Sequence, residues 1–311
     1  MFEKIFGHNN QIQFFKKSFI NKFPQSWIIH GEKGIGKFLL ANQMAKWCLL
    51  EKYKKINLNK NSINKTVLNK LIVSNIFLMN NRRIDKFGIN DIREISKEMH
   101  LTSSNEIEKF IIFDDFNETN IQSKNALLKS LEEPKNNNII IIISHNISIL
   151  PKTISSRCIK IMLKTLNLND FKNYYLTKDE KLKEEKLNQI FLLSSGRPGL
   201  ADFIIDNDWI NILKKINIIL ENKKINFSIL YEISTIFEKN PYYVNFLIKS
   251  HLYYHSKKIL LQNLSNKDIF RGINLYYSSL GKPINFDLNL NLINYLVSLF
   301  TTFFKYIKKS S

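Results

Sequence analysis

The chain has 311 residues, of which 44% are hydrophobic, so it is long enough for roughly two or three domains with real cores. Its two cysteines, Cys48 and Cys158, are too few for a disulfide framework or a four-cysteine zinc site. The formal net charge of +19 suits a nucleic-acid partner. Lysine, asparagine and isoleucine are abundant throughout, however, so we favour a solvated lysine background and leave a role in DNA association open.

The two ends of the sequence give expectations about localisation. The start, MFEKIFGHNN, has no charged segment followed by an apolar one, as a secretion signal would have. The most apolar C-terminal run, 292–304, is interrupted by polar residues and is shorter than the ~20 residues that span a bilayer. A soluble, cytoplasmic protein is therefore expected.

The first predicted elements are a helix, a strand and a second helix. Residues 1–25 are expected to form a helix that Pro24 ends, and SWIIH at 26–30 is expected to be a short buried strand. After a glycine-rich stretch, apolar residues recur on one face of a helix: Leu40, Met44, Trp47 and Cys48. This order of strand, loop and helix is the setting that a phosphate-binding loop requires.

The next segments alternate between predicted helices and strands. Residues 51–70 are rich in Lys and Asn and are expected to form a loop or a loosely held helical hairpin, and 89–100 a helix. KFIIFDD at 109–115 is an apolar run that ends in two carboxylates, which is typical of a parallel strand buried on both faces.

A further helix and strand complete the first part of the chain. The helix is expected over 121–133, before Pro134, and the strand over Ile139 to Ile143, ending at Ser144. Alternating strands and helices predict an α/β fold with a parallel sheet over about 1–165.

The remainder of the chain is expected to be helical, because no strand-like run follows about residue 166. The segment SSGRPG at 194–199 is predicted to be a turn. One apolar helical face is predicted near the C-terminus, and a helical-bundle core is the favoured interpretation of it, formed by Leu292, Tyr295, Leu299, Phe303 and Tyr306.

The glycine-rich stretch GEKGIGKF, 31–38, is close to a phosphate-binding P-loop. The pattern G-x-x-x-x-G-K-[ST] cradles phosphate with backbone N–H groups, reaches it with the Lys, and holds Mg²⁺ with the hydroxyl. Gly31, Gly36 and Lys37 match, but Phe38 stands where the hydroxyl belongs. The stretch is thus a hydrolytic site, a former one, or a glycine turn that only resembles one.

Two carboxylates end the predicted strand at 109–115. In P-loop proteins a carboxylate at such a strand end holds the Mg²⁺ shell, and in ATPases the next acidic residue positions the attacking water. Asp114 fits the first role, and Asp115 stands where an ATPase normally has the longer Glu. Two carboxylates that merely face solvent at a strand end are the alternative.

Three segments resemble the sliding-clamp loader subunits of replicative DNA polymerases. NALLKSLEEPKNNNIIIIISHNISILPKTISSRCIKI at 125–161 carries NALLK, LEEP and SRC in the family's order and at about its spacing. Residues 5–37 resemble the family's N-terminal box and P-loop, and SSGRPGLA at 194–201 the start of its second-sensor helix. The resemblance covers about the first 205 residues.

Within this family the chain resembles the delta-prime type of the bacterial DNA polymerase III loader. The motor subunits carry an intact GK[ST], an Asp-Glu pair and a four-cysteine zinc module. This chain has Phe38, Asp115 and a lone Cys48 at the corresponding positions. The departures imply a stator that hydrolyses no ATP alone, binds no zinc and binds ATP weakly at most.

The resemblance also implies domains and partners. It implies an AAA+-like α/β domain with a degenerate P-loop over 1–165, a helical lid over 166–207, and an all-helical collar for oligomerisation over 208–311. The implied partners are the motor (gamma/tau) and delta subunits, the sliding clamp and, through the complex, primed DNA, with no membrane.

The resemblance finally implies roles for single residues. Arg157 of SRC is expected to act as an arginine finger in trans at a neighbouring motor subunit, and the alternative is that it pairs locally with an acidic side chain. The degenerate nucleotide site is expected to comprise Gly31, Gly34, Gly36, Lys37, Asp114, Asp115, Ser144 and Arg197. The alternatives are an active motor ATPase of the same loader and a stand-alone P-loop enzyme.

Overall fold

The chain is described by a computed structural model over residues 5–20, 23–56, 65–80, 108–133, 138–178, 183–263 and 292–308. It divides into two compact units, Met1–Gly199 and Leu200–Ser311. Helix α9 (Pro198–Asp206) begins in the first unit and ends in the second. The division into three domains at 165 and 207 stays a prediction.

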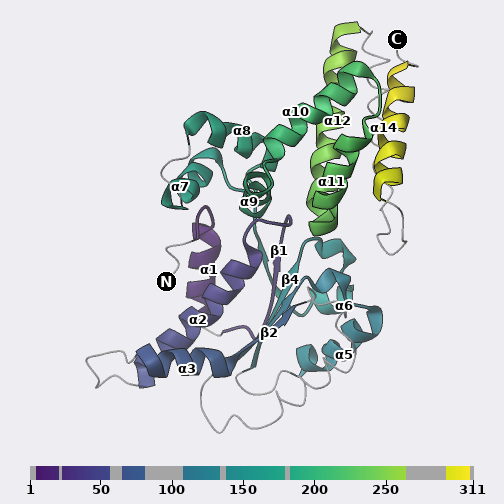
Figure 1. The fold of residues 1–311 in the computed structure, drawn as a ribbon. Coiled ribbons are helices and arrows are strands. Elements are labelled where there is room, and N and C mark those ends of the chain that lie inside the picture. Colours follow the sequence, from purple (N-terminus) through teal and green to yellow (C-terminus); the bar gives the residue numbers. More distant parts are fainter. Residues whose placement is uncertain are drawn as a thin grey trace. The chain divides into compact units, whose positions relative to one another are not determined.

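The first unit is built on a parallel sheet. In the described part of the chain the strand order is β2-β3-β4-β1-β5, and every neighbouring pair is parallel (Figure 1). The bounds are Ser26–His30 for β1, Ile76–Asn80 for β2, Lys109–Asp114 for β3, Asn138–Ser144 for β4 and Ile159–Met162 for β5. The predicted α/β fold with a parallel sheet is confirmed.

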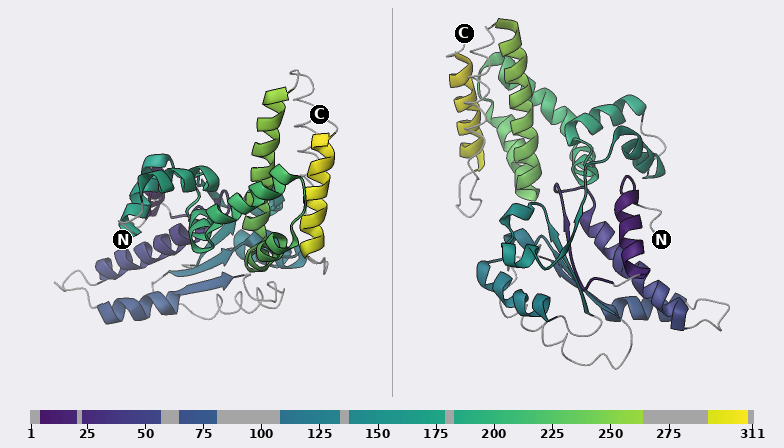
Figure 2. Two further views of the ribbon diagram at one scale, coloured as in Figure 1. Left: turned by 45° about the horizontal axis from the view of Figure 1, so that its top comes forward. Right: turned by 180° about the vertical axis from the view of Figure 1, so that it is seen from behind.

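Helices lie on both faces of this sheet. The helices of this unit before α9 are α1 (Asn9–Ile20), α2 (Lys37–Ile56), α3 (Lys65–Asn75), α5 (Ile121–Glu132), α6 (Lys152–Ser155), α7 (Leu168–Lys178) and α8 (Glu184–Ser194). Two single turns, η1 (Phe116–Glu118) and η2 (Ile147–Ile149), follow β3 and β4. Helices α1 and α2 lie on one side of the sheet and α5 and α6 on the other, as Figure 2 also shows from behind.

The strand β4 explains why both faces are covered. Its residues Ile139, Ile141 and Ile143 belong to the core cluster that includes side chains of α1 and α2. Ile140 and Ile142 belong to the second cluster, with side chains of α5 and α6. Because side chains alternate along a strand, an unbroken isoleucine run can only be buried if both faces are packed.

The structure corrects several boundaries drawn from the sequence. The first helix is shorter than expected, Asn9–Ile20, and begins after Gly7, whose φ of 73° is unsuited to a helix. The segment 51–70 continues α2 to Ile56 and begins α3 at Lys65, and 57–64 lie outside the described residues. The helix expected near 89–100 also lies outside them.

Two strands were missed by the sequence analysis, and both lie at the edges of the sheet. The β5 strand has only four residues, and three of them are exposed. In β2, Leu78 is 48% exposed. In β5, Lys160 interrupts the apolar residues, so no continuous apolar run marked this strand. In β2 the apolar run at 76–79 was present in the sequence but was not used to predict a strand.

The described residues of the second unit are helical, as expected. The helices after α9 are α10 (Trp209–Asn222), α11 (Phe227–Lys239), α12 (Pro241–Asn263) and α14 (Leu292–Lys308). On α14 the described side chains that are buried are Leu296, Phe300 and Phe303, and Tyr295 packs against Phe237, so the packed face shares Tyr295 and Phe303 with the predicted one. No helix among the described residues has the length and apolar character needed to cross a membrane.

Shortening a central isoleucine should destabilise the first unit. Ile141→Ala removes a side chain that is 0% exposed in β4, and we expect the free energy of unfolding to fall by about 2–5 kcal/mol. Ile149→Ala is the matched control, because Ile149 is 52% exposed and its loss should cost less than ~0.5 kcal/mol. Urea unfolding followed by circular dichroism measures both, and equal losses would contradict the central position of β4.

Candidate functional site

The P-loop connects β1 to α2 at the carboxyl edge of the sheet. Gly31, Gly34 and Gly36 have φ angles of 142°, 87° and 91°, which L side chains rarely adopt. A Cβ on Gly31 would lie 2.4 Å from the carbonyl oxygen of Leu163, whereas one on Gly36 would meet nothing within 4 Å. Gly31 is therefore required by a close backbone approach, and the space beside Gly36 is open.

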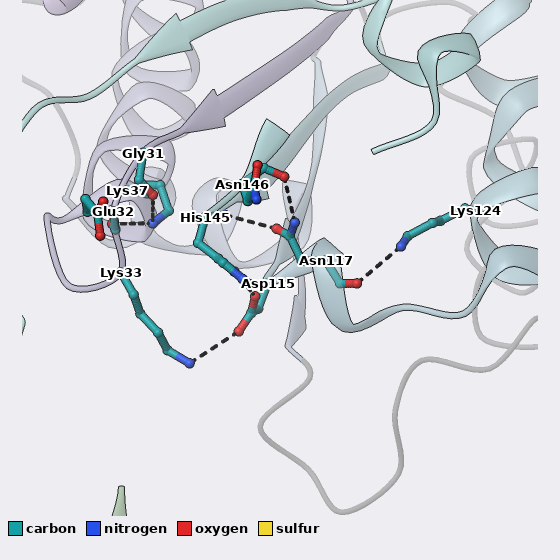
Figure 3. A network of polar contacts seen from close by, with 9 residues as sticks. All are labelled: Gly31, Glu32, Lys33, Lys37, Asp115, Asn117, Lys124, His145 and Asn146. Atoms are coloured by element: carbon teal, nitrogen blue, oxygen red, sulfur yellow. Dashed lines mark hydrogen bonds and ion pairs between the residues drawn. The ribbon is translucent and has the colours of Figure 1, made fainter. Parts of the chain in front are cut away.

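The side chain of Lys37 is turned back onto its own loop. Its Nζ donates to the carbonyl oxygens of Gly31 and Glu32, at 2.8 and 2.7 Å (Figure 3). Burial lowers the pKa of Lys37 to about 8, although the carboxylates of Asp115 and Asp114 act in the opposite direction. A phosphate that engaged this amine would have to replace two backbone carbonyls as its partner.

Phe38 follows Lys37 on the first turn of α2. Its ring is partly buried and packs against the core cluster between α1, α2 and the sheet. It supplies no oxygen where a P-loop has its Mg²⁺-binding hydroxyl. This position of the loop therefore provides no side-chain ligand for Mg²⁺, and the expectation of at most weak ATP binding stays a prediction.

The carboxylates predicted at the end of β3 lie beside this loop. Asp114 ends the strand and is 8% exposed. Asp115 adopts a left-handed conformation, with φ 60° and ψ 48°, and caps the turn η1. One oxygen of Asp115 lies 3.0 Å from His145 Nδ1, and the other lies 3.7 Å from Lys33 Nζ. The position expected to activate water is thus engaged by a histidine and a lysine.

The charge of Asp115 follows from these neighbours. Burial works to raise the pKa of this carboxyl. The hydrogen bond from His145 and the charges of Lys33 and Lys37 outweigh burial and hold the pKa below its usual value. Asp115 is therefore ionised at neutral pH and pairs with groups of its own chain.

Ser144 ends β4 directly beside the P-loop. The backbone N–H of Gly31 donates to the carbonyl oxygen of Ser144 at 3.3 Å. The Ser144 side chain is 0% exposed, and within the described residues its Oγ has no hydrogen-bond partner. The predicted sensor position is thus adjacent to the loop, and its role as a sensor stays a prediction.

Asn117 joins the ends of β3 and β4, and the sequence analysis missed it. Its side chain accepts from the backbone N–H of His145 at 2.9 Å and donates to the carbonyl oxygen of Asn146 at 2.8 Å (Figure 3). Lys124 Nζ in turn donates to the Asn117 carbonyl at 3.2 Å. No spacing in the sequence links Asn117 to His145, because the sheet alone brings these strand ends together.

The turn at 194–199 is fixed to the P-loop. Arg197 is 2% exposed, donates from Nε to the carbonyl of Ser194 at 2.9 Å, and places Nη1 3.5 Å from a carboxylate oxygen of Glu32. The N–H of Gly199 donates to the carbonyl of Gly34 at 2.8 Å. The predicted second-sensor arginine therefore meets the loop through Glu32.

Arg157 lies apart from the other predicted site residues. It precedes β5, whereas the P-loop follows the parallel neighbour β1, so the two are at opposite ends of these strands. Its guanidinium pairs with Glu132 at 2.8 Å and donates to the carbonyl of Thr153 at 2.7 Å. Among the contacts of the described residues, Arg157 makes none with its own P-loop.

The two cysteines lie in the two cores. Cys48 is 0% exposed in the cluster with α1 and α2, and Cys158 is 8% exposed in the cluster with α5 and α6. Burial raises the pKa of the Cys48 thiol, and it raises that of Cys158 to about 12. The described residues contain no group of three metal-ligating side chains, and the expectation of no zinc stays a prediction.

The sheet order, the glycine loop before α2 and the carboxylates that end β3 define a P-loop domain of the AAA+ type. Residues 7–167 match the family described as DNA polymerase III, delta subunit. Because this match covers more than half of the chain, the protein belongs to that family of clamp-loader subunits.

The relatives carry two different names. A DNA polymerase III subunit gamma from Buchnera aphidicola subsp. Schizaphis graminum is 28% identical over 176 residues, 56% of this chain and 47% of the relative. A subunit delta' from the same organism is 29% identical over 150 residues, 47% of this chain and 46% of the relative. The chain thus spans about half the length of these curated relatives.

A solved structure shows a more distant similarity. It is a gamma-subunit-related protein of DNA polymerase III from Thermotoga maritima, 16% identical, with a TM-score of 0.46 over 95% of this chain and 99% of that chain. So low a score carries no weight for function.

The pairing of Asp115 predicts a pH dependence of stability. Because the folded-state pKa is lowered, the carboxylate stabilises the fold fully above the usual Asp pKa of ~3.9, and this contribution is lost as the pH falls through the lower folded value. Asp115→Asn should therefore lower the free energy of unfolding at pH 7 by roughly 1–2 kcal/mol. The difference should vanish below the folded pKa.

Urea unfolding of both proteins from pH 2 to pH 7 measures this difference. Glu133→Gln is the control, because Glu133 is exposed and forms no ion pair among the described residues. A loss in Asp115→Asn that was equally large at pH 2 and pH 7 would show that the carboxylate charge is not its cause.

Proposed function

We propose that this chain is the delta-prime, or stator, subunit of a DNA polymerase III clamp loader. It helps to load the sliding clamp onto primed DNA, and it supplies Arg157 in trans to a neighbouring motor subunit. The observation that carries the proposal is the placement of Phe38. Its partly buried ring packs against the core cluster at the position where a motor needs a hydroxyl for Mg²⁺.

The remaining loop contacts support a subunit without its own turnover. Lys37 is hydrogen-bonded to loop carbonyls, and Asp115 pairs with His145 and Lys33. Asp115 is also one methylene shorter than the Glu that positions water in ATPases. Losing a single group that stabilises a transition state can cost ~10²–10³ in rate, so the combined departures leave little catalytic power.

The contacts between the 194–199 turn and the P-loop also support the proposed stator function. The N–H of Gly199 donates to the carbonyl of Gly34, and Arg197 pairs with Glu32, so the turn contacts the P-loop directly. Gly196 adds a close approach, since a Cβ there would lie 2.3 Å from the carbonyl oxygen of Leu166. These contacts within the chain suit a stator in which the P-loop supports the fold.

The position of Arg157 supports a role at the nucleotide site of another subunit. The side chain is 37% exposed, and it lies at the end of the strands opposite to the chain's own P-loop. A guanidinium presented to the γ-phosphate of a neighbour is worth ~10³–10⁵ in rate in other NTPases. Few of the chain's 46 Lys and Arg residues are Arg. Arg157 suits a bidentate contact with phosphate, which a Lys cannot make.

The second candidate is an active motor subunit of the same loader. It is favoured by the gamma subunits among the relatives and by the retention of Gly31, Gly36 and Lys37. In this case Phe38 and Asp115 would be tolerated substitutions, and the chain would hydrolyse ATP itself.

An ATPase assay of the purified chain separates these candidates. We expect no turnover above background, with or without primed DNA and sliding clamp, because the P-loop hydroxyl that binds Mg²⁺ is replaced by Phe38. Lys37→Ala is the control and should leave the background rate unchanged. Turnover that DNA and clamp stimulate and that Lys37→Ala abolishes would establish the motor function instead.

A second test concerns Arg157 in a loader reconstituted with motor and delta subunits. Arg157→Ala should leave assembly intact and reduce hydrolysis at the adjacent motor site by ~10³–10⁵, so total turnover falls by that site's contribution. The matched control is Lys152→Ala, which removes an exposed cation from the neighbouring helix α6. An unchanged rate of turnover in the assembled Arg157→Ala complex would show that the finger assignment is wrong.

A further inference from the structure

We propose that Glu132 is a positioning residue for the arginine finger. It would hold the Arg157 guanidinium in one orientation before a neighbouring subunit's nucleotide arrives. The proposal rests on the proposed function of Arg157 in trans. It assigns a role to the carboxylate at the end of α5, which lies outside the nucleotide site described above.

The core brings the two residues together. Leu131 and Cys158 belong to the same buried cluster, although they are far apart in the sequence. Glu132 follows Leu131 as the last residue of α5, and Arg157 directly precedes Cys158. Because Leu131 and Cys158 are both buried in this cluster, they fix the positions of the adjacent Glu132 and Arg157 at the surface.

The contacts hold the guanidinium at two points. Nη2 lies 2.8 Å from Glu132 Oε1, and Nη1 donates to the Thr153 carbonyl at 2.7 Å. An arginine has five N–H donors, so about three are not used by these two bonds. The side chain is therefore oriented and still able to bind an anion.

The exposure of the pair indicates what the contact does. The side chains of Arg157 and Glu132 are 37% and 48% exposed, and an ion pair of this kind adds little to stability. It does restrict a long side chain that would otherwise sample many rotamers. The benefit of the pair is then a pre-organised finger, since catalysis gains from groups that need no reorientation.

The neighbouring carboxylate makes the assignment specific. Glu133 is also exposed but forms no ion pair among the described residues. Its backbone N–H donates to the Lys129 carbonyl and caps α5. Of these two adjacent glutamates, the structure assigns Glu132 alone to Arg157.

The test uses the full chain in a loader reconstituted with motor and delta subunits. The quantity measured is the Arg157-dependent turnover, which is the ATPase rate lost in Arg157→Ala. Glu132→Ala should reduce this quantity about 2- to 5-fold at saturating ATP, with assembly and the KM for ATP unchanged. Glu132→Gln keeps an acceptor oxygen and should lose less, and the control Glu133→Ala should lose nothing.

The double variant Glu132→Ala/Arg157→Ala separates positioning from other effects. It should be no slower than Arg157→Ala alone, because Glu132 acts only through the guanidinium. An undiminished rate in Glu132→Ala, or a further loss in the double variant, would overturn the proposal while leaving the finger intact. If Arg157→Ala itself loses no turnover, the proposed function fails and this inference fails with it.

Discussion

The fold and the site both depend on the burial of β4 on its two faces. Five consecutive isoleucines pack against α1 and α2 on one side and against α5 and α6 on the other. This strand lies between β1 and β3 and pairs in parallel with both, so the three strands end at the same edge of the sheet. The P-loop after β1, the carboxylates after β3 and Ser144 consequently meet at one edge of the sheet.

At this edge the chain's polar groups are largely occupied by one another. Lys37 contacts backbone carbonyls, Asp115 contacts His145 and Lys33, and Asn117 connects the two strand ends. Desolvated charges are costly unless they are paired, so a loop without a metal ligand is stabilised by internal partners. Residue types that are typical of a nucleotide site here form contacts that connect the P-loop, the ends of β3 and β4, and the 194–199 turn.

The opposite end of the strands carries different chemistry. There the second core cluster anchors Leu131 and Cys158, and the adjacent Glu132 and Arg157 form an exposed ion pair. A degenerate loop at one edge and an oriented arginine at the other are consistent with a family member that contributes to a neighbour's reaction. Among the contacts of the described residues, Arg157 and Glu132 make none with the P-loop, as the proposed function requires of a chain that acts on a neighbour.

The sequence by itself determined the central strands, the glycine loop with its altered last position, and the family, because continuous apolar runs and short motifs are local signals. The edge strand β5 lacked such a signal because Lys160 interrupts it, the apolar run of β2 was overlooked, and the packed face of α14 overlapped the predicted one only in part. Only the tertiary structure decided that Phe38 packs against the core cluster, that Asn117 reaches His145 and that Arg157 pairs with Glu132. These contacts join residues distant in the chain, and their geometry arises from the packing of sheet and helices rather than from any spacing in the sequence.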